Sequence, residues 1–240
     1  MSSCSPSQAD CHSTLTGWIR RVADARRRHG TAAAVARAAY RLAQRLVNAW
    51  VTRVLWLDRE ALASCDAARG DYAFRFLTAE EVRRLADDRA NDLEAALADM
   101  LASGKDFCFA ALAAGRLAAY AWFALERIEP AHAAGAGVSY PADVAYLYKA
   151  YTHPDFRGRR LCGAVTEAAL RALDQRGVSK LLCLVEWANE ASLRSCRRTG
   201  WTDLGRLVSF GYGRCRLVFA PRSARERGIV FGCRRPTRAV

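Results

Sequence analysis

The stretch from residue 144 to residue 187 constrains the fold most, because it predicts a strand, a loop, a helix and a second strand in direct succession. Val144–Thr152 is aromatic and apolar, as a buried strand is. Apolar residues then recur at helical spacing from about residue 161 to Gln175, and Gly177 ends the repeat. Residues 180–187 form another apolar run. Two strands joined through a helix pair in parallel, so the chain predicts an α/β sheet with a parallel crossover.

The remaining segments predict mainly antiparallel strands. Thr78 and Glu81 have the spacing of a helix capping box, and a helical stretch follows to about residue 101. The residues Ala114, Gly115 and Arg116 predict a hairpin turn. The predicted fold class is therefore α/β (α+β), with a mixed, mostly antiparallel central sheet flanked by helices and an N-terminal helical extension. The further strands are expected at residues 51–58, 71–77, 107–112, 117–125, 201–210 and 213–219, with a surface loop at 128–142.

Composition divides the chain into four parts. We expect a disordered polar tail over residues 1–13, a basic amphipathic helical extension over 14–60, one domain over 61–220 and a basic tail over 221–240. In the extension, residues 32–50 carry an apolar face and an arginine face. Such a helix either contacts a membrane or a partner protein, or packs as a solvated helix on the main domain, and both interpretations stay open. The apolar face is Val35, Ala39, Leu42, Leu46 and Trp50, and the arginines are Arg37, Arg41 and Arg45.

The charge is strongly positive and unevenly distributed. The chain has 37 basic and 24 acidic residues, a net charge of +13, and residues 156–240 hold 18 of the basic and 6 of the acidic ones. An anionic ligand is therefore expected in the last third of the chain. Arginine bias of a GC-rich genome accounts for the charge equally well. No helix-turn-helix or RNA-binding motif accompanies it, so no nucleic-acid partner is expected.

The nine cysteines form no Cys-x-x-Cys pair and no zinc-ligand spacing, so neither a metal site nor a disulfide framework is predicted. Several stand in apolar runs, Cys183 among them, and read as reduced core residues. The chain has no apolar run of about 18 residues and no apolar segment near its first residue. We therefore expect a cytoplasmic protein without a membrane-spanning helix.

The chemistry centres on the loop between Thr152 and the helix that begins near Leu161. His153 and Pro154 break the strand, and three arginines and Gly158 follow. At such a turn several backbone N–H groups point to one spot in front of a helix N-terminus, where arginines add positive charge. The ligand that fits is a pyrophosphate, and the alternative is a plain surface loop.

Two blocks together resemble the GNAT superfamily of acetyl-CoA-dependent N-acyltransferases. Residues 152–165 resemble the family's acyl-CoA loop, and residues 189–201 resemble its second signature. Asn189, Ser192, Gly200 and Trp201 stand in the family's order within the second block. The resemblance extends over about residues 74–219 and implies a GNAT-like fold with acetyl-CoA as the acyl donor.

The resemblance also implies roles for individual residues. The strand end at Tyr151 and Thr152 would pair its backbone with the pantetheine arm of the donor. Asn189 and Ser192 would contact the same arm, and the backbone N–H groups of the loop would hold the pyrophosphate. The implied loop residues are Arg157, Gly158, Arg159, Arg160, Leu161, Cys162, Gly163 and Ala164.

The implied reaction is direct attack of a primary amine on the acetyl thioester, which needs a base and a proton source for the thiolate. Glu186 ends an apolar strand beside the expected thioester and is the candidate base; the alternative is a solvated or ion-paired carboxylate. The family's usual acidic tyrosine falls on Cys196, so the acid is solvent or a strand tyrosine such as Tyr148. Arg160 and Cys162 replace loop glycines of the family. These departures keep a second function open, a non-catalytic acyl-CoA-binding or regulatory module.

The acceptor is expected to be a small-molecule or peptide amine. By analogy with the family, the acidic helical stretch over residues 80–99 would border the acceptor site and favour a cationic amine. The alternative is an ordinary solvated helix face. The oligomeric state stays open.

Overall fold

The computed structural model describes residue 31 and residues 35–62, 71–104, 106–125, 136–212 and 215–232. The chain divides into two units, Met1–Ala49 and Trp50–Val240. Within the described ranges, no helix is both long enough and apolar enough to cross a bilayer.

In the first unit, the described part is a helix over residues 35–47. Asn48, with φ at 45°, ends it, since a left-handed residue cannot continue a right-handed helix. Trp50, which the apolar spacing placed on this helix, instead begins a strand. The predicted tail over residues 1–13 and the start of the predicted extension lie outside the described residues.

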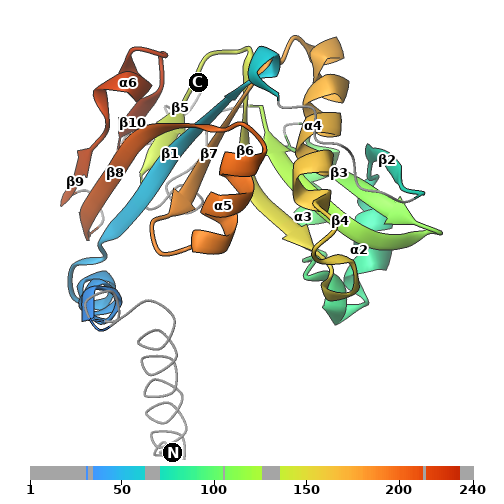
Figure 1. The fold of residues 1–240 in the computed structure, drawn as a ribbon, viewed down its shortest axis with the longest axis horizontal. Coiled ribbons are helices and arrows are strands. Elements are labelled where there is room, and N and C mark those ends of the chain that lie inside the picture. Colours follow the sequence, from blue (N-terminus) through green and yellow to red (C-terminus); the bar gives the residue numbers. More distant parts are fainter. Residues whose placement is uncertain are drawn as a thin grey trace, which may run out of the picture. The chain divides into compact units, whose positions relative to one another are not determined.

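The second unit is built on an eight-stranded sheet with the order β2-β3-β4-β6-β7-β1-β8-β9 (Figure 1). The pair β6–β7 is parallel and every other neighbouring pair is antiparallel, which confirms the predicted mixed, mostly antiparallel sheet. The strands are β1 (Trp50–Asp58), β2 (Ala73–Phe76), β3 (Asp106–Ala113), β4 (Arg116–Ala124), β6 (Val144–Thr152), β7 (Lys180–Glu186), β8 (Thr202–Tyr212) and β9 (Cys215–Phe219).

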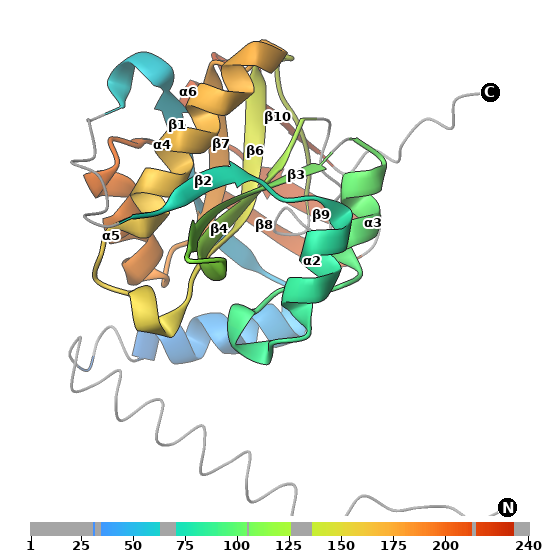
Figure 2. The same ribbon diagram turned by 90° about the vertical axis from the view of Figure 1, so that its right-hand side faces the viewer.

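Helices cover both faces of this sheet (Figures 1 and 2). On one face, α4 (Leu161–Leu173) and α5 (Glu190–Arg198) pack on β3, β4, β6 and β7. On the other face lie α2 (Ala79–Ala86), α3 (Leu97–Ala102) and the short α6 (Arg222–Arg225). Single 3₁₀ turns occur at Arg59–Ala61, Arg89–Asn91, Pro154–Phe156 and Asp174–Arg176.

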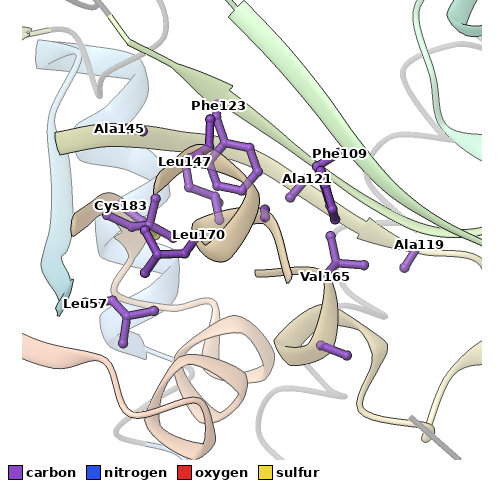
Figure 3. Close-up of a cluster of buried hydrophobic side chains, with 14 of the residues drawn as sticks. Leu57, Phe109, Ala119, Ala121, Phe123, Ala145, Leu147, Val165, Leu170 and Cys183 are labelled. Carbon is purple, nitrogen blue, oxygen red and sulfur yellow. The ribbon is translucent and has the colours of Figure 1, made fainter. Parts of the chain in front are cut away.

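Each face of the sheet carries a buried core. Successive side chains of β4 point alternately into one core and the other. Ala121 and Phe123 point to the face that carries α4, and Tyr120 and Trp122 point to the face that carries α2 and α3. Figure 3 shows the first of these cores, in which Phe123 gathers with side chains from β1, β6, β7 and α4. Because both faces are covered, β4 is buried along almost its whole length.

The strand over Trp50–Asp58 corrects the predicted domain boundary at residue 61. β1 lies inside the sheet, with Leu55 opposite Cys183 of β7 and Val54 opposite Gly205 of β8. Leu57 and Val54 are fully buried on opposite faces, so this strand contributes to both cores. The domain therefore begins at Trp50, and the predicted helical extension is shorter than residues 14–60.

The predicted basic tail over residues 221–240 is also partly wrong. After α6, β10 (Val230–Gly232) pairs antiparallel with β5 (Gly137–Ser139) in a two-stranded sheet. Ala224 and Ile229 are fully buried against the central sheet. The arginines between them kept these apolar residues from standing out as a pattern. Residues 233–240 lie outside the described ranges.

Two local predictions are confirmed at the residue level. Thr78 Oγ1 accepts from the Glu81 N–H, and the Glu81 carboxylate accepts from the Thr78 N–H, which is the capping box that begins α2. Ala114 and Gly115, both with positive φ, form the turn between β3 and β4. The helical stretch that was expected to reach residue 101 is divided into α2, a 3₁₀ turn and α3.

Candidate functional site

The candidate site opens where β6 and β7 stop pairing. Their last paired residues are Leu147 and Cys183, although β6 continues to Thr152 and β7 to Glu186. On its other side β6 carries a bulge, since Phe123 of β4 faces Leu147 while Trp122 already faces Lys149. The extra residue bends β6 away from β7. Figure 1 shows the two strands diverging beyond their paired part.

A pocket of about 520 Å³ fills this opening. Its apolar floor includes Leu147, Val185 and Trp201. The structure brings together there the predicted site residues Tyr148, Tyr151, Thr152, Arg157, Cys162, Glu186, Asn189 and Ser192. The predicted loop residues Gly158, Arg159, Arg160, Leu161, Gly163 and Ala164 follow the strand at the N-terminus of α4 and do not line the pocket itself.

Phe156 anchors the loop between β6 and α4. Its ring is buried and packs edge-on against Tyr72 and His153, with centroids 6.4 and 5.9 Å away. The guanidinium groups of Arg116 and Arg159 lie over the same ring, at 5.7 and 5.4 Å. The His153 Nδ1 accepts from the Asp155 N–H at 3.3 Å, so this histidine has a structural role. The loop is therefore fixed by its own contacts.

Two left-handed residues turn the loop into the helix. Gly158 has φ at +81°, with open space where a Cβ would stand, and Arg160 has φ at +58° at the N-cap of α4. No side chain caps α4. The N–H groups of Leu161 and Gly163 accordingly find no acceptor among the described residues, as is usual for the first turn of a helix.

Not every backbone N–H group from Arg157 to Ala164 is available to bind a pyrophosphate. The Arg157 N–H donates to the Pro154 carbonyl at 3.2 Å, and the Ala164 N–H donates to the Arg160 carbonyl at 3.2 Å. These two donors are therefore used inside the loop and the helix. The donors that fit an anion are those between them.

The three loop arginines differ in their contacts. Arg157 lines the pocket, and its Nε donates to the Thr152 carbonyl at 3.4 Å. Arg159 is turned toward Tyr72, whose hydroxyl it contacts at 3.2 Å. The Arg160 side chain makes no hydrogen bond or ion pair within the described part of the chain. Arg157 and Arg160 are therefore the cations available to a ligand, and Arg159 holds the loop.

Asn189 begins α5 at the pocket wall. Its side-chain oxygen accepts from the Ser192 N–H at 3.2 Å, and its own N–H donates to the Glu186 carbonyl at 2.9 Å. The spacing of Asn189 and Ser192 is thus first a helix cap. The amide nitrogen of the Asn189 side chain has no hydrogen-bond partner within the described residues.

The two candidate catalytic side chains differ in availability. Glu186 ends β7 at the pocket, and among the described residues its carboxylate makes no hydrogen bond or ion pair. The Tyr148 hydroxyl instead donates to Asp106 Oδ2 at 2.8 Å, and its ring packs on Trp122 with centroids 6.2 Å apart. Burial and the adjacent Asp106 carboxylate raise the pKa of Tyr148 well above its usual range. Of the two candidates, only Tyr148 therefore has a hydrogen-bond partner for its functional group within the described residues.

A family model described as "Acetyltransferase (GNAT) family" matches residues 71–201, which is more than half of the chain. The chain belongs to the GNAT family of acetyltransferases. The GNAT match begins just before β2 and ends at Trp201, so β1, β8, β9 and the C-terminal elements lie outside it.

Two solved GNAT structures are similar to the chain at low sequence identity. A GNAT-family acetyltransferase from Colwellia psychrerythraea is 15% identical, with a TM-score of 0.48 over 68% of this chain and 57% of that one. A GCN5-related N-acetyltransferase from Kribbella flavida is 15% identical, with a TM-score of 0.48 over 73% of this chain and 63% of that one. The chain thus spans less than two thirds of either relative. No curated protein matches the sequence significantly.

On one side of the pocket, β6 makes hydrogen bonds to the acidic segment over residues 80–99. The Tyr151 hydroxyl donates to the Ala90 carbonyl at 2.7 Å, and Lys149 Nζ donates to the Asp92 carbonyl at 2.7 Å. Lys149 also lies 3.4 Å from the Glu94 carboxylate. The segment therefore stands beside β6, with part of its negative charge balanced by one lysine.

The sequence analysis did not predict that three cysteines line the pocket between β6 and β7. Cys162, Cys183 and Cys196 all line it, from α4, β7 and α5. Cys183 was read as a core residue, and it is buried, but it also forms pocket wall. No short spacing links the three positions, so only the folded chain could bring them together.

Proposed function

We propose that this protein transfers the acetyl group of acetyl-CoA to a primary amine by direct attack on the thioester. The observation that carries the proposal is the pocket between the separated ends of β6 and β7, which lies in front of the uncapped N-terminus of α4. Membership of the GNAT family supports the same reaction class.

The residues present fit the donor. Beyond Leu147, the edge of β6 that faces β7 has no strand partner, so its backbone groups can pair with the amides of a pantetheine arm. The N–H groups of Leu161 and Gly163 have no acceptor among the described residues, so they can donate to a pyrophosphate. Arg157 and Arg160 supply the positive charge that such a ligand needs. Asn189 and Ser192 lie on the opposite wall for the pantetheine arm.

Glu186 is assigned as the base in the proposed reaction. Its carboxylate would take one proton from the attacking ammonium or amine, directly or through a water. Backbone N–H groups on the part of β6 that has separated from β7 would stabilise the negative charge that forms on the thioester oxygen. The thiolate that leaves would take its proton from solvent, because Asp106 holds the proton of Tyr148. Tyr148 then acts as pocket wall.

The acceptor is proposed to be a cationic amine. Asp92 and Glu94 lie beside the part of β6 that bounds the pocket, and Lys149 balances only part of their charge.

We also place the protein in a reducing compartment such as the cytoplasm, because the cysteines at 108, 162, 183 and 196 carry free thiols.

The test begins with acetyl-CoA binding by calorimetry, followed by thiol release on a panel of polyamines, aminoglycosides and peptide N-termini. Glu186→Gln should lower kcat about 100-fold or more while changing the Kd of acetyl-CoA less than about twofold. Glu190→Gln is the matched control, because Glu190 is a neighbouring carboxylate that pairs with Arg194 on α5.

Two results would contradict the proposal. Absence of acetyl-CoA binding at high micromolar concentration removes the donor site. Binding without thiol release on any acceptor favours the non-catalytic acyl-CoA-binding module instead.

A further inference from the structure

Two cysteine thiols meet in the wall of the pocket. Cys183 stands on β7 and Cys196 on α5, and Cys196 packs against the core cluster to which Cys183 belongs. Both line the pocket, and both are free thiols. Two thiols in contact at a solvent-connected cavity are placed for joint chemistry that neither could perform alone.

The fold holds this contact in place. Opposite Leu55 of β1, Cys183 points into the core on the α4 face, where Figure 3 shows it beside Leu147 and Leu170. Cys196 packs on the same core from α5, and its carbonyl accepts the N–H of Trp201 at 3.1 Å. A buried strand and a capped helix thus fix the two sulfur atoms.

The two thiols differ in environment. Cys183 is only 4% exposed, whereas Cys196 is half-buried and reaches the pocket. Hydrogen bonding between the two thiols lowers the pKa of Cys196 and, together with burial, raises that of Cys183. A more exposed thiolate beside a buried thiol is the arrangement of an attacking and a resolving cysteine.

We propose that Cys196 is a peroxide-reactive thiol of the pocket and that Cys183 resolves its oxidised form into a Cys183–Cys196 disulfide. The Cys196 thiolate attacks one oxygen of hydrogen peroxide, the O–O bond breaks, and the leaving hydroxide takes a proton to give water. The Cys183 sulfur then displaces the sulfenic oxygen, which leaves with the Cys183 proton as a second water. Two thiols and one peroxide thereby give one disulfide and two waters.

The disulfide would shorten the distance between α5 and β7 at the pocket wall. A hydrogen-bonded pair of sulfurs lies well beyond the S–S bond length of about 2 Å, so closure must draw the two elements together. We expect weaker acetyl-CoA binding by the oxidised protein, a consequence that rests on the proposed function.

The first experiment treats the full chain with hydrogen peroxide and maps its peptides by mass spectrometry. Wild-type protein should lose about 2 Da, give a peptide pair joined through Cys183 and Cys196, and recover with dithiothreitol. A pair joined through Cys162, or oxidation of Cys196 to the sulfinic acid without a linked peptide, would overturn the proposal. Cys108→Ser is the control, since Cys108 is buried on the opposite face of the sheet and should leave the linkage unchanged.

Two substitutions of Cys183 separate resolution from activation. Cys183→Ser keeps a hydrogen-bond donor, so Cys196 should still react with iodoacetamide near the wild-type rate, while peroxide should leave a sulfenic acid that dimedone traps. Cys183→Val removes the donor and should slow the alkylation of Cys196 about tenfold. Thermal unfolding by circular dichroism establishes that each variant is folded. Equal alkylation rates for all three proteins would contradict the paired-thiol assignment.

Acetyl-CoA distinguishes this inference from the proposed function. Saturating acetyl-CoA should protect Cys196 from alkylation if the donor occupies the pocket. Disulfide formation without such protection would support the thiol pair and count against the donor site. Protection without a disulfide would support the donor site and overturn the thiol pair.

Discussion

The Tyr148 hydroxyl donates to Asp106, and this hydrogen bond decides between two roles that are equivalent in the sequence. An aromatic residue on a strand beside an active site is either a proton donor or a wall. Asp106 is only 5% exposed, so its carboxylate depends on hydrogen bonds that replace water. The structure therefore favours a role for Tyr148 as pocket wall. The residue type alone could not distinguish the two roles.

Tyr148→Phe tests this role. The variant should lose about 1–2 kcal/mol of unfolding free energy, because Asp106 loses a donor in a buried place. Its kcat should change less than about threefold, whereas loss of a true acid costs about 100-fold. Urea unfolding and steady-state kinetics measure the two effects, and a large fall in kcat without loss of stability would restore Tyr148 as the acid.

The loop arginines are expected to differ in how much each contributes to acetyl-CoA binding. Arg160→Glu should weaken acetyl-CoA binding about tenfold or more, because it places a negative charge at the uncapped start of α4. Calorimetry at low and moderate salt measures the loss, which should shrink as screening increases. Arg159→Glu is the matched control, since Arg159 contacts Tyr72 and Phe156 and should affect binding less. Equal losses in both variants would mean that only the net charge of the loop matters.

At the scale of elements, the sequence predicted most boundaries to within a few residues. The capping box of Thr78 and Glu81 begins α2, and the turn at Gly115 joins β3 to β4. Each of these signals acts between residues that are near neighbours in the chain. The stretch to residue 101 was expected to be helical with room for a break, and the position of that break was not predicted, because Asp92 adopts a left-handed conformation that its residue type does not require.

The start of α2 carries a pH-dependent contribution to stability. Hydrogen bonds from Arg75 and from the Thr78 N–H lower the pKa of Glu81 from 4.5 to about 2. A lowered folded-state pKa stabilises the fold above about pH 4.5, and this contribution is lost as the pH falls toward 2. Glu81→Gln should therefore cost about 1–2 kcal/mol at pH 7, with allowance for solvent screening, and nothing near pH 2.

Glu80→Gln is the matched control for this prediction. Glu80 lies in the same first turn of α2 but takes no part in the capping box. Urea unfolding of both variants between pH 7 and pH 2 makes the comparison. A constant difference between wild type and Glu81→Gln across that range would contradict the assignment.

At the scale of the whole molecule, β1 decides how the sheet is assembled. It lies between β7 and β8 and pairs antiparallel with both, so among the described strands it is the one that joins the two parts of the sheet. The family match begins at residue 71 and gives no sign of this strand. A segment placed outside the domain by sequence is therefore in its centre.

Leu57→Ala tests the contribution of β1. Leu57 is fully buried in the core on the α4 face, so its truncation should cost about 2–5 kcal/mol of unfolding free energy. Leu217→Ala on the edge strand β9 is the control and should cost less than about 0.5 kcal/mol, because Leu217 is 56% exposed. A loss below about 1 kcal/mol at Leu57 would contradict a central place for β1.

Sequence reasoning recovers the periodicity of most helices and strands, the capping box, the hairpin turn, the glycine-containing loop before α4 and the family. These features depend on residues close together in the chain, where steric and hydrogen-bonding preferences act directly. Four features become visible in three dimensions alone: the insertion of β1, the return of α6 and β10 onto the sheet, the pairing of Tyr148 with Asp106, and the meeting of Cys183 with Cys196. These contacts join residues that are distant in the chain, and burial of apolar surface selects them without leaving a local pattern.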